Sequence, residues 1–307
     1  MRIVLSRKGF DQGSGGAASP VFEDGTIFSL PIPDGRTLCR YGDMRHGGVC
    51  VGEVVDHLTG GRYGARSYAH LDPDLDAGRM PRIDGWKPAF GQTGAAQRHL
   101  ANEGVGIGDL FLFFGWFEDV ERHSGRWRKK PGGRSVHALH GWLQVGEILD
   151  LSSGSLEAWR HHPWLAAHPH VGRGPETGNT VYVASERLVV NGRDTGFAGA
   201  GHLGEISAPS TLTAPGQPLK SVWALPAFLT PSGGCRLSYH GDPARWPEKD
   251  GRQLLRSVGR GQEFVADVGD GTVAVEWLSS VIGPEGQGAG EAGPDGDRSG
   301  AKSSSLM

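Results

Sequence analysis

The sequence predicts an α+β protein that is predominantly β, built on a mixed or antiparallel sheet or barrel with a few short helices. Three observations lead to this prediction. The 307 residues include 51 glycines and 19 prolines, which favour frequent turns. The apolar runs at 108–116 and 138–147 have strand length, and each contains a Gly-Trp pair. Long segments with helical periodicity, which a helical bundle requires, are few.

The N-terminal half alternates short predicted elements with one irregular segment, 34–87, which is polar and Gly-rich and is expected to leave the core. The best-defined helix has Thr93 as a candidate N-cap and Gly104 as its stop. In chain order we expect a strand at 2–5, a hairpin or sheet edge at 22–30, helices at 52–58 and 93–102, and strands at 108–116 and 138–148.

The C-terminal half continues with elements of the same kind. We expect a helix at 155–161, strands at 180–184 and 188–190, a short helix that starts at Asp242, and strands at 261–267 and 272–278. From 283 onward Gly, Pro, Glu, Asp and Ser dominate, which is typical of a disordered tail. The predicted organisation is therefore one domain at 1–282 and a tail at 283–307.

Charge and cysteine usage limit the classes of protein that fit. The formal net charge of −3 excludes a globally basic surface for nucleic acid, so such a contact has to be local. The three cysteines are far apart and form no Cys-x-x-Cys pair, which indicates neither a disulfide framework nor a thiolate zinc site. We expect a cytoplasmic protein with no membrane partner, because no signal-like or membrane-spanning apolar run is present.

The segment 122–134 is a candidate for local contact with nucleic acid. Its basic residues surround Trp127, so cations would hold phosphates while the ring stacks on a base. The alternative is a solvated hairpin tip between two strands. The basic residues are Arg126, Arg128, Lys129, Lys130 and Arg134.

Aromatic residues at the ends of the two apolar runs are candidates for base stacking. Trp116 and Trp142 each follow a glycine, so small residues would leave room for a ring between them. The alternative is that both are ordinary core aromatics of a β protein.

The end of the first strand carries candidate phosphate ligands. Arg7 and Lys8 follow residues 2–5 and would lie at the carboxyl end of a strand, beside Asp11. The Gly-Ser-Gly-Gly stretch at 13–16 lacks the Gly-Lys-Ser/Thr ending of a Walker loop, so nucleoside triphosphate hydrolysis is not indicated. The alternative is that Arg7 and Lys8 are surface cations paired with carboxylates.

Histidines gather at 161–170. His168 and His170 can point the same way and chelate a metal, with His202, His240 or a carboxylate as a third ligand. No spacing selects that third ligand, and the motifs of zinc hydrolases and deaminases are absent. We therefore expect hydrogen-bonding histidines and assign no metal.

Polar residues embedded in apolar strands are candidates for reading the edge of a base. Asn179, Tyr239 and Gln262 need hydrogen-bonding partners, which the Watson–Crick edge of a base can supply. Backbone partners are the alternative and are favoured for Asn179, which lies in a Gly-Asn-Thr turn.

Two resemblances follow from these segments. On order of elements, residues 92–150 resemble the PUA-like group, some of whose members read bases. The segments 3–11, 108–116, 140–147 and 260–264 together resemble the nucleotide modification associated domains of the third type, over nearly 1 to 281. That resemblance implies a role beside systems that modify bases in DNA, in bacteria and their phages, and carries no catalytic assignment or cofactor.

Three functions remain open at this level. The first is an enzyme that installs or elaborates a modified base, with Asp11, Glu263 or His168 as acid or base and Arg7 and Lys8 on phosphate. The second is a non-catalytic reader that holds a modified base between Trp116 and Trp142. The third is a structural or regulatory β protein. The expected partners of the first two are a nucleotide, DNA or RNA, and other base-modification proteins.

Overall fold

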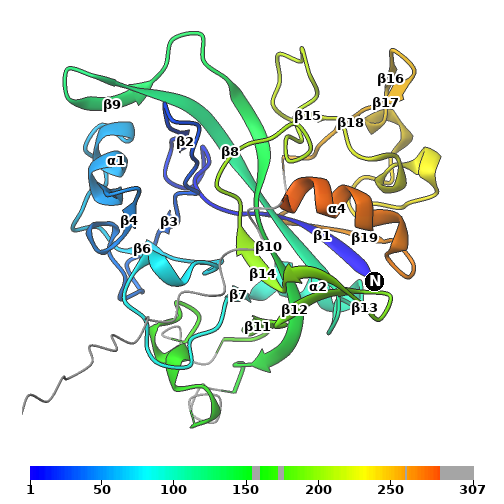
Figure 1. Ribbon diagram of the computed structural model, residues 1–307, viewed down its shortest axis with the longest axis horizontal. Helices are drawn as coiled ribbons and strands as arrows, with labels where there is room; N and C mark the ends of the chain where they lie inside the picture. The colour runs from blue at the N-terminus through cyan, green and yellow to red at the C-terminus, as the bar shows by residue number, and fades with distance from the viewer. Residues whose placement is uncertain (154–159, 172–175, 260, 284–307) are drawn as a thin grey trace, which may run out of the picture.

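The computed structural model describes residues 1–153, 160–171, 176–259 and 261–283. Its centre is a mixed sheet of nine strands (Figure 1). The strands are β1 (Arg2–Arg7), β2 (Ser19–Val21), β7 (Ala89–Gln92), β8 (Leu110–His123), β9 (Arg126–Lys129), β10 (Ser135–Asp150), β11 (Thr180–Ala184), β14 (Ala200–His202) and β19 (Glu263–Asp267).

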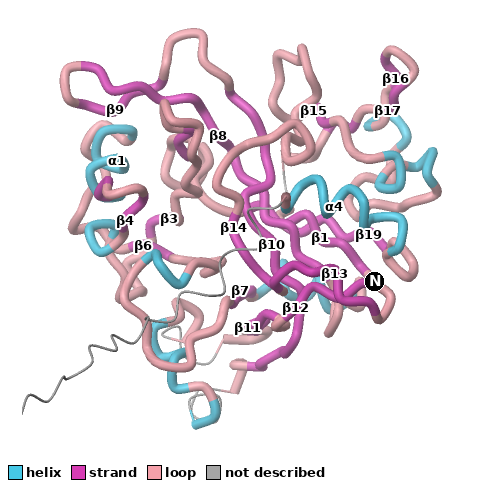
Figure 2. Tube along the Cα trace, viewed as in Figure 1, coloured by secondary structure: helices cyan, strands magenta, loops and turns pink. Residues whose placement is uncertain are grey.

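The main path of the sheet runs β19-β1-β8-β10-β11-β7, and β2, β9 and β14 pair outside it. β1 lies antiparallel to β19 and parallel to β8, so the sheet is mixed. The remaining strands are short and form separate pairs, and helices are few (Figure 2). The predicted α+β class, predominantly β, is confirmed.

Ten short strands make up five two-stranded sheets outside the main one. They are β3 (Ile32–Pro33) with β6 (Ala69–His70), β4 (Arg45–His46) with β5 (Val49–Cys50), β12 (Arg187–Val190) with β13 (Arg193–Ala198), β15 (Val222–Trp223) with β18 (Leu255–Arg256), and β16 (Glu248–Lys249) with β17 (Arg252–Gln253).

The α-helices are α1 (Val51–Leu58), α2 (Gly94–Asn102) and α4 (Val275–Ile282). Single 3-10 turns lie at Tyr41–Asp43, Ala77–Arg79, Pro163–Ala167, Ala227–Leu229, Pro231–Gly233, Pro243–Arg245 and Thr272–Ala274. None of these helices has the length and apolar character needed to cross a membrane, within the part of the chain that the structure describes.

The sheet bends because β10 pairs with different strands along its length. Its first part, to Gln144, pairs with β8, and its second part, from Val145, pairs with β11. A register shift between Val145 and Glu147 marks the bend, as a bulge does in a curved sheet. The bend returns β7 toward β19, where the Gln92 side chain donates a hydrogen bond to Glu263. The two ends of the sheet path therefore meet at their side chains.

The two faces of the sheet bury different clusters, because successive side chains of a strand point to opposite faces. Val4 of β1 joins an inner cluster enclosed by the bend, whereas Ile3 and Leu5 join an outer cluster. The outer cluster is covered by α4 and by the C-terminal segments beside it (Figure 1). The inner cluster consists of Val4, Phe90, Leu100, Phe111, Phe113, Leu143, Val145, Tyr182 and Val265.

The predicted strand at 272–278 is wrong: this segment is the 3-10 turn Thr272–Ala274 followed by α4. Ala274 and Leu278 are buried with Val281 and Ile282, at helical spacing, while Val273 is 61% exposed. A strand would have buried alternate residues instead. The β-branched residues favour a strand locally, but packing of one helical face on the outer cluster stabilises the helix.

Other predicted elements differ from the structure in smaller ways. The hairpin or sheet edge predicted at 22–30 is a tight turn with a bridge between Val21 and Ile27, and the strand that pairs with the main sheet lies before it, in β2. The helix predicted at 155–161 falls mostly outside the described residues, as does the predicted tail. The predicted helices at 52–58 and 93–102 are confirmed as α1 and α2, and the short helix predicted to start at Asp242 is a single 3-10 turn, Pro243–Arg245, with Asp242 as its N-cap.

The segment 34–87 shares one apolar cluster with residues before it and with residues of β8 and β9. Its helix α1 packs against the hairpin of β8 and β9 (Figure 1), and the backbone N–H of Trp127 donates to His57 Nδ1 at 3.1 Å. The same segment supplies His70 and Asp72, which lie beside the end of β1. Its irregular sequence therefore builds one wall of a site.

Candidate functional site

A cavity of about 510 Å³ lies at the carboxyl end of β1. Segments far apart in the sequence meet there, which is typical of a ligand site. Its walls are the end of β1 with the following loop, the segment after β6, β7 with the start of α2, the turn at His170, and the loop before β19. The lining residues are Arg7, Lys8, Gly9, Asp11, Ser14, Ile32, His70, Asp72, Gly91, Gln92, Thr93, Ala96, His170, Gly259, Gly261 and Gln262.

Arg7 is fixed by backbone rather than by a carboxylate. Its Nη1 and Nη2 donate to the carbonyls of Gly259 and Val258 at 2.9 and 2.8 Å, and its Nε is buried without a partner. Burial lowers the pKa of Arg7, which the nearby Asp11 carboxylate partly opposes. Among the described residues Arg7 makes no ion pair, so it keeps the capacity to bind an anion.

Lys8 is neutralised inside the protein. Its Nζ lies 2.9 Å from Glu263 Oε1 and 4.4 Å from the centroid of the Phe90 ring. Gln92 Nε2 donates to the same Glu263 oxygen at 2.5 Å, whereas Glu263 Oε2 is buried with no hydrogen-bonding partner. Glu263 is therefore held by two residues that line the cavity, and its second oxygen is buried behind them without a hydrogen-bonding partner.

Asp11, Gln262 and Tyr239 lie at the cavity or its rim. Asp11 Oδ1 accepts from the backbone N–H of Ser14 at 2.6 Å, which closes a tight turn in the loop after β1. Gln262 is exposed and lines the cavity. Tyr239 is 50% exposed, and its ring lies beside Gly261. The centroids of the Tyr239 and His99 rings are 4.4 Å apart. An aromatic face is thus available beside the opening.

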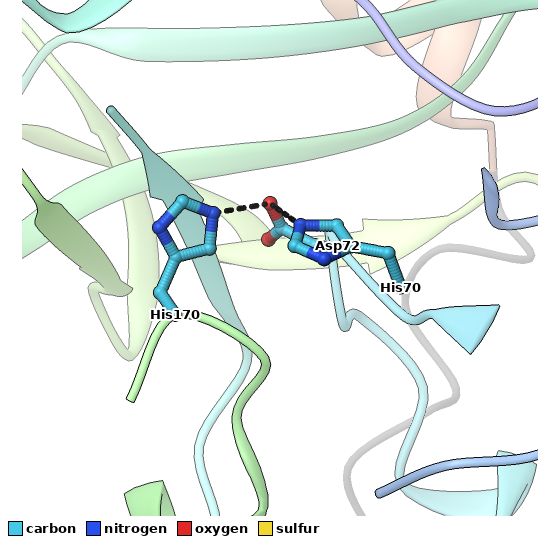
Figure 3. Close-up of side chains that lie close together, drawn as sticks. All are labelled: His70, Asp72 and His170. Carbon is cyan, nitrogen blue, oxygen red and sulfur yellow. Dashed lines mark ion pairs between the residues drawn. The ribbon is translucent and has the colours of Figure 1, made fainter. Parts of the chain in front are cut away.

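Two imidazoles flank the carboxylate of Asp72 in the cavity wall (Figure 3). His70 Nε2 lies 3.6 Å and His170 Nε2 lies 3.5 Å from Asp72 Oδ2. The other oxygen, Oδ1, accepts from the backbone N–H of Gly91 at 2.8 Å and lies 3.7 Å from His168 Nε2.

The hydrogen bonds around His170 determine which of its nitrogens carries a proton. Asn179 Nδ2 donates to the His170 carbonyl at 2.9 Å, which fixes the orientation of the amide. Asn179 Oδ1 therefore faces His170 Nδ1, at 2.8 Å, and that nitrogen must donate. Both ends of the Asn179 amide are thus hydrogen-bonded within the protein, one to a backbone carbonyl and the other to a side chain, whereas the alternative expected backbone partners.

His168 and His70 are oriented in related ways. The backbone N–H of His170 donates to His168 Nδ1 at 3.3 Å, so the proton of His168 lies on Nε2, toward Asp72. His70 Nδ1 lies 3.3 Å from Asp34 Oδ2, an acceptor. His168 does not line the cavity but lies behind Asp72.

The two tryptophans do not lie together. Trp142 is buried in the outer cluster, where its Nε1 donates to the Ala198 carbonyl at 3.0 Å. Trp116 donates to Ser135 Oγ at 3.0 Å, and Lys220 Nζ lies 4.1 Å from its ring centroid. Trp142 is paired with Leu112, four residues from Trp116 along β8, a separation of about 14 Å in a strand. The two rings cannot hold one base between them.

The aromatic ring and most of the cations of the basic hairpin of β8 and β9 contact other residues of the protein. Trp127 is buried against Phe22, with ring centroids 5.1 Å apart, so its face is not open to a base. Four of the five predicted cations pair with carboxylates, Arg126 with Asp56, Arg128 with Glu121, Lys129 with Glu118, and Arg134 with Asp119, as does Arg122 with Glu53. The fifth, Lys130, is exposed and makes no ion pair among the described residues. These contacts fit the alternative of a solvated hairpin.

Sequence reasoning missed three residues of this site: His70, Asp72 and Gln92. The first two lie in the segment expected to leave the core. A usable signal was present, because His70-x-Asp72 and His168-x-His170 share the spacing that places two side chains on one side of an extended chain.

Comparison with known protein families shows which family the chain resembles. The family model described as nucleotide modification associated domain 3 matches residues 2–267, which include every residue of the cavity wall. Neither a curated protein nor a solved structure matches the chain. The resemblance to the PUA-like group therefore remains a prediction.

Proposed function

The chain belongs to the nucleotide modification associated domain 3 family, and from this premise we propose that it is an enzyme that installs or elaborates a modified base. The proposed substrate is a nucleotide, free or within DNA or RNA, bound in the cavity at the end of β1. Other base-modification proteins are its proposed partners, and the proposed location is the cytoplasm of a bacterial cell, as the family resemblance implies.

The observation that carries this proposal is a set of buried polar atoms without partners around the cavity. They are Glu263 Oε2, Arg7 Nε and Thr93 Oγ1. Leaving such an atom unsatisfied costs about 1–3 kcal/mol, so folding stability alone does not favour the arrangement. Unsatisfied groups of this kind in a cavity are typical of a site that binds or transforms a ligand.

The cavity has features that suit a nucleotide. Arg7 offers a cation without a carboxylate partner, and the N-terminus of α2 opens at Thr93, where backbone N–H groups favour an anion. A phosphate between Arg7 and α2 would leave the base near Tyr239, whose half-exposed ring can stack on it.

Acid-base groups favour an enzyme over a reader. Asp11 and Asp72 line the cavity, and Glu263 has one buried oxygen without a partner behind Lys8 and Gln92. A reader needs shape and hydrogen bonds but no buried carboxylates of this kind. The slot proposed for a reader, between Trp116 and Trp142, is not formed.

The test is mass spectrometry of nucleosides digested from the DNA and RNA of host cells with and without this gene. The expected result is loss of one modified nucleoside on deletion, restored by the wild-type gene but not by Glu263→Gln. The control is Arg126→Gln in the basic hairpin, which should restore the nucleoside fully. An unchanged nucleoside profile on deletion would contradict an enzymatic role and favour a reader.

A further inference from the structure

His70, Asp72 and His170 have the spacing of metal ligands rather than of hydrogen-bonded groups. The Nε2–Oδ2 separations of 3.5 and 3.6 Å are longer than a hydrogen bond. Two ligand atoms that each lie about 2.0–2.2 Å from a tetrahedral ion are about 3.4 Å apart. One ligand atom from each of the three residues can be chosen so that all lie within 4.8 Å of one another.

The remaining polar contacts prepare these atoms for an ion. Asn179 requires the proton of His170 to lie on Nδ1, so in the neutral ring Nε2 presents a lone pair to Asp72. His70 Nδ1 faces the carboxylate of Asp34, which favours a proton on Nδ1 and therefore a lone pair on His70 Nε2. Outer groups that hold the second nitrogen of a histidine in this way are typical of metal centres.

Three acceptors that point at one another repel unless a cation lies between them. Two additional protons would supply that charge, but charged hydrogen bonds contract to about 2.7–2.9 Å, well below the separations found here. A divalent ion supplies the same charge at the separations observed.

We propose that His70 Nε2, His170 Nε2 and Asp72 Oδ2 bind one divalent transition-metal ion, Zn²⁺ or Fe²⁺. Imidazole ligands select these ions over Mg²⁺ and Ca²⁺, which prefer oxygen ligands. Only three protein ligands are used and all three line the cavity, so further coordination positions face the space where a substrate binds. The site is thus of the open type used in catalysis.

The backbone supports this assignment. A Cβ built on Gly91 would lie 2.3 Å from His170 Cδ2, so only glycine lets β7 approach the imidazole this closely. The N–H of the same residue holds Asp72 Oδ1, which leaves Oδ2 for the ion. Gly91 therefore positions two of the three proposed ligands.

The metal site is independent of the nucleotide, so its test uses no nucleotide. Full-length protein freed of metal by chelation is titrated with Co²⁺, which reports ligand geometry by visible absorption, and then with Zn²⁺ and, without oxygen, Fe²⁺. Metal content after desalting is measured by mass spectrometry. The proposal predicts about one ion per chain and a higher melting temperature with metal.

The variants separate this site from binding elsewhere. His170→Gln should abolish the Co²⁺ bands and the metal-induced rise in melting temperature. Asn179→Ala should weaken Co²⁺ binding by about 10–100-fold, because only the second shell is lost. His202→Gln is the matched control: its Nε2 lies 4.0 Å from Asp76, outside the proposed ligands, and binding should not change.

The wild-type titration decides the question even if a variant does not fold. Folded wild-type protein that retains no Co²⁺, Zn²⁺ or Fe²⁺ would overturn the proposal and leave protonated histidines around Asp72. Equal metal binding by His170→Gln, with the fold retained, would also overturn it. Either outcome leaves the nucleoside test of the proposed function unaffected.

Discussion

The cavity at the end of β1 and the basic hairpin of β8 and β9 are both rich in charge but differ in how that charge is satisfied. In the hairpin five cations pair with carboxylates, the ring of Trp127 is buried, and Lys130, which makes no ion pair among the described residues, is exposed to solvent. At the cavity, within the described residues, Arg7 makes no ion pair and Glu263 Oε2 has no partner. Density of charge in the sequence is thus a weaker guide to a site than charged groups that the fold buries with some of their atoms unpaired.

Removal of one lysine from each region should give the largest contrast. Lys8 and Glu263 have side chains only 10% and 1% exposed, so Lys8→Ala leaves a buried carboxylate without its cation and should cost about 3–5 kcal/mol. Lys129 is 60% exposed, and Lys129→Ala should cost about 0–1 kcal/mol. Urea denaturation of both variants measures the difference.

A second change sharpens this contrast. The double variant Lys8→Ala, Glu263→Gln removes the buried charge with its partner and should recover much of the lost stability. If Lys8→Ala and Lys129→Ala lowered the free energy of unfolding by equal, small amounts, the buried and the exposed ion pair would contribute equally to stability, against this prediction.

Substitution of one glycine should affect the cavity next most strongly. Gly91→Ala brings a methyl group into the His170 ring and should cost about 1–3 kcal/mol, with loss of metal binding. Gly35→Ala is the control, because a Cβ there meets nothing within 4 Å. Thermal melts and Co²⁺ titration of the two variants test this, and normal Co²⁺ binding by Gly91→Ala would refute the close approach.

Acid should destabilise the protein through histidines buried in the sheet rather than through its surface. Burial lowers the pKa of His137 and His140 to about 3, with Arg7 adding to the effect on His137. Each stays neutral when folded but gains a proton when unfolded below about pH 6.5. Their contribution to stability is therefore complete above about pH 6.5 and is lost as the pH falls toward 3, by up to about 1.4 kcal/mol per pH unit for each histidine.

Denaturation at pH 7.5 and 5.0 measures this slope. His137→Gln should reduce the dependence of stability on pH by the contribution of one histidine. The substitution also weakens the 3.1 Å hydrogen bond that Trp223 Nε1 donates to His137. The stability of the variant at pH 7.5 is therefore the reference for its own pH dependence. A variant slope equal to that of the wild type would mean that His137 titrates normally in the folded protein.

The smallest effect is expected at the tip of the hairpin. Arg126 is 60% exposed and lies 3.5 Å from Asp56, which is 44% exposed, so Arg126→Ala should change stability by less than about 1 kcal/mol. A larger loss, measured by the same urea denaturation, would place the hairpin among the structural supports of the fold.

The sequence predicted the sheet better than it predicted the site. β1, β8, β10 and β11 follow from apolar runs, because burial on both faces of a strand leaves a continuous apolar pattern. α4 was missed since its β-branched residues resemble a strand, and only the outer cluster that it covers selects the helix.

The residues of the candidate site also differ in how well the sequence predicts them. Arg7, Lys8, Asp11 and Gln262 were predictable because they follow or precede strands that pair at one edge, β1 and β19. His70 and Asp72 were not, because their position depends on how 34–87 folds back onto the sheet. Trp116 and Trp142 looked equivalent in sequence, but pairing of β8 with β10 places them far apart.

The most direct test of the cavity as the functional site is titration of the protein with nucleoside monophosphates and a short single-stranded DNA. Arg7→Ala should weaken binding at least about ten-fold, since a charge-assisted phosphate contact is lost. Arg126→Ala should stay within about two-fold of the wild type, because its charge is already paired at the surface. If Arg126→Ala weakened binding and Arg7→Ala left the affinity unchanged, the nucleotide would lie on the hairpin. That result would contradict the assignment to the cavity.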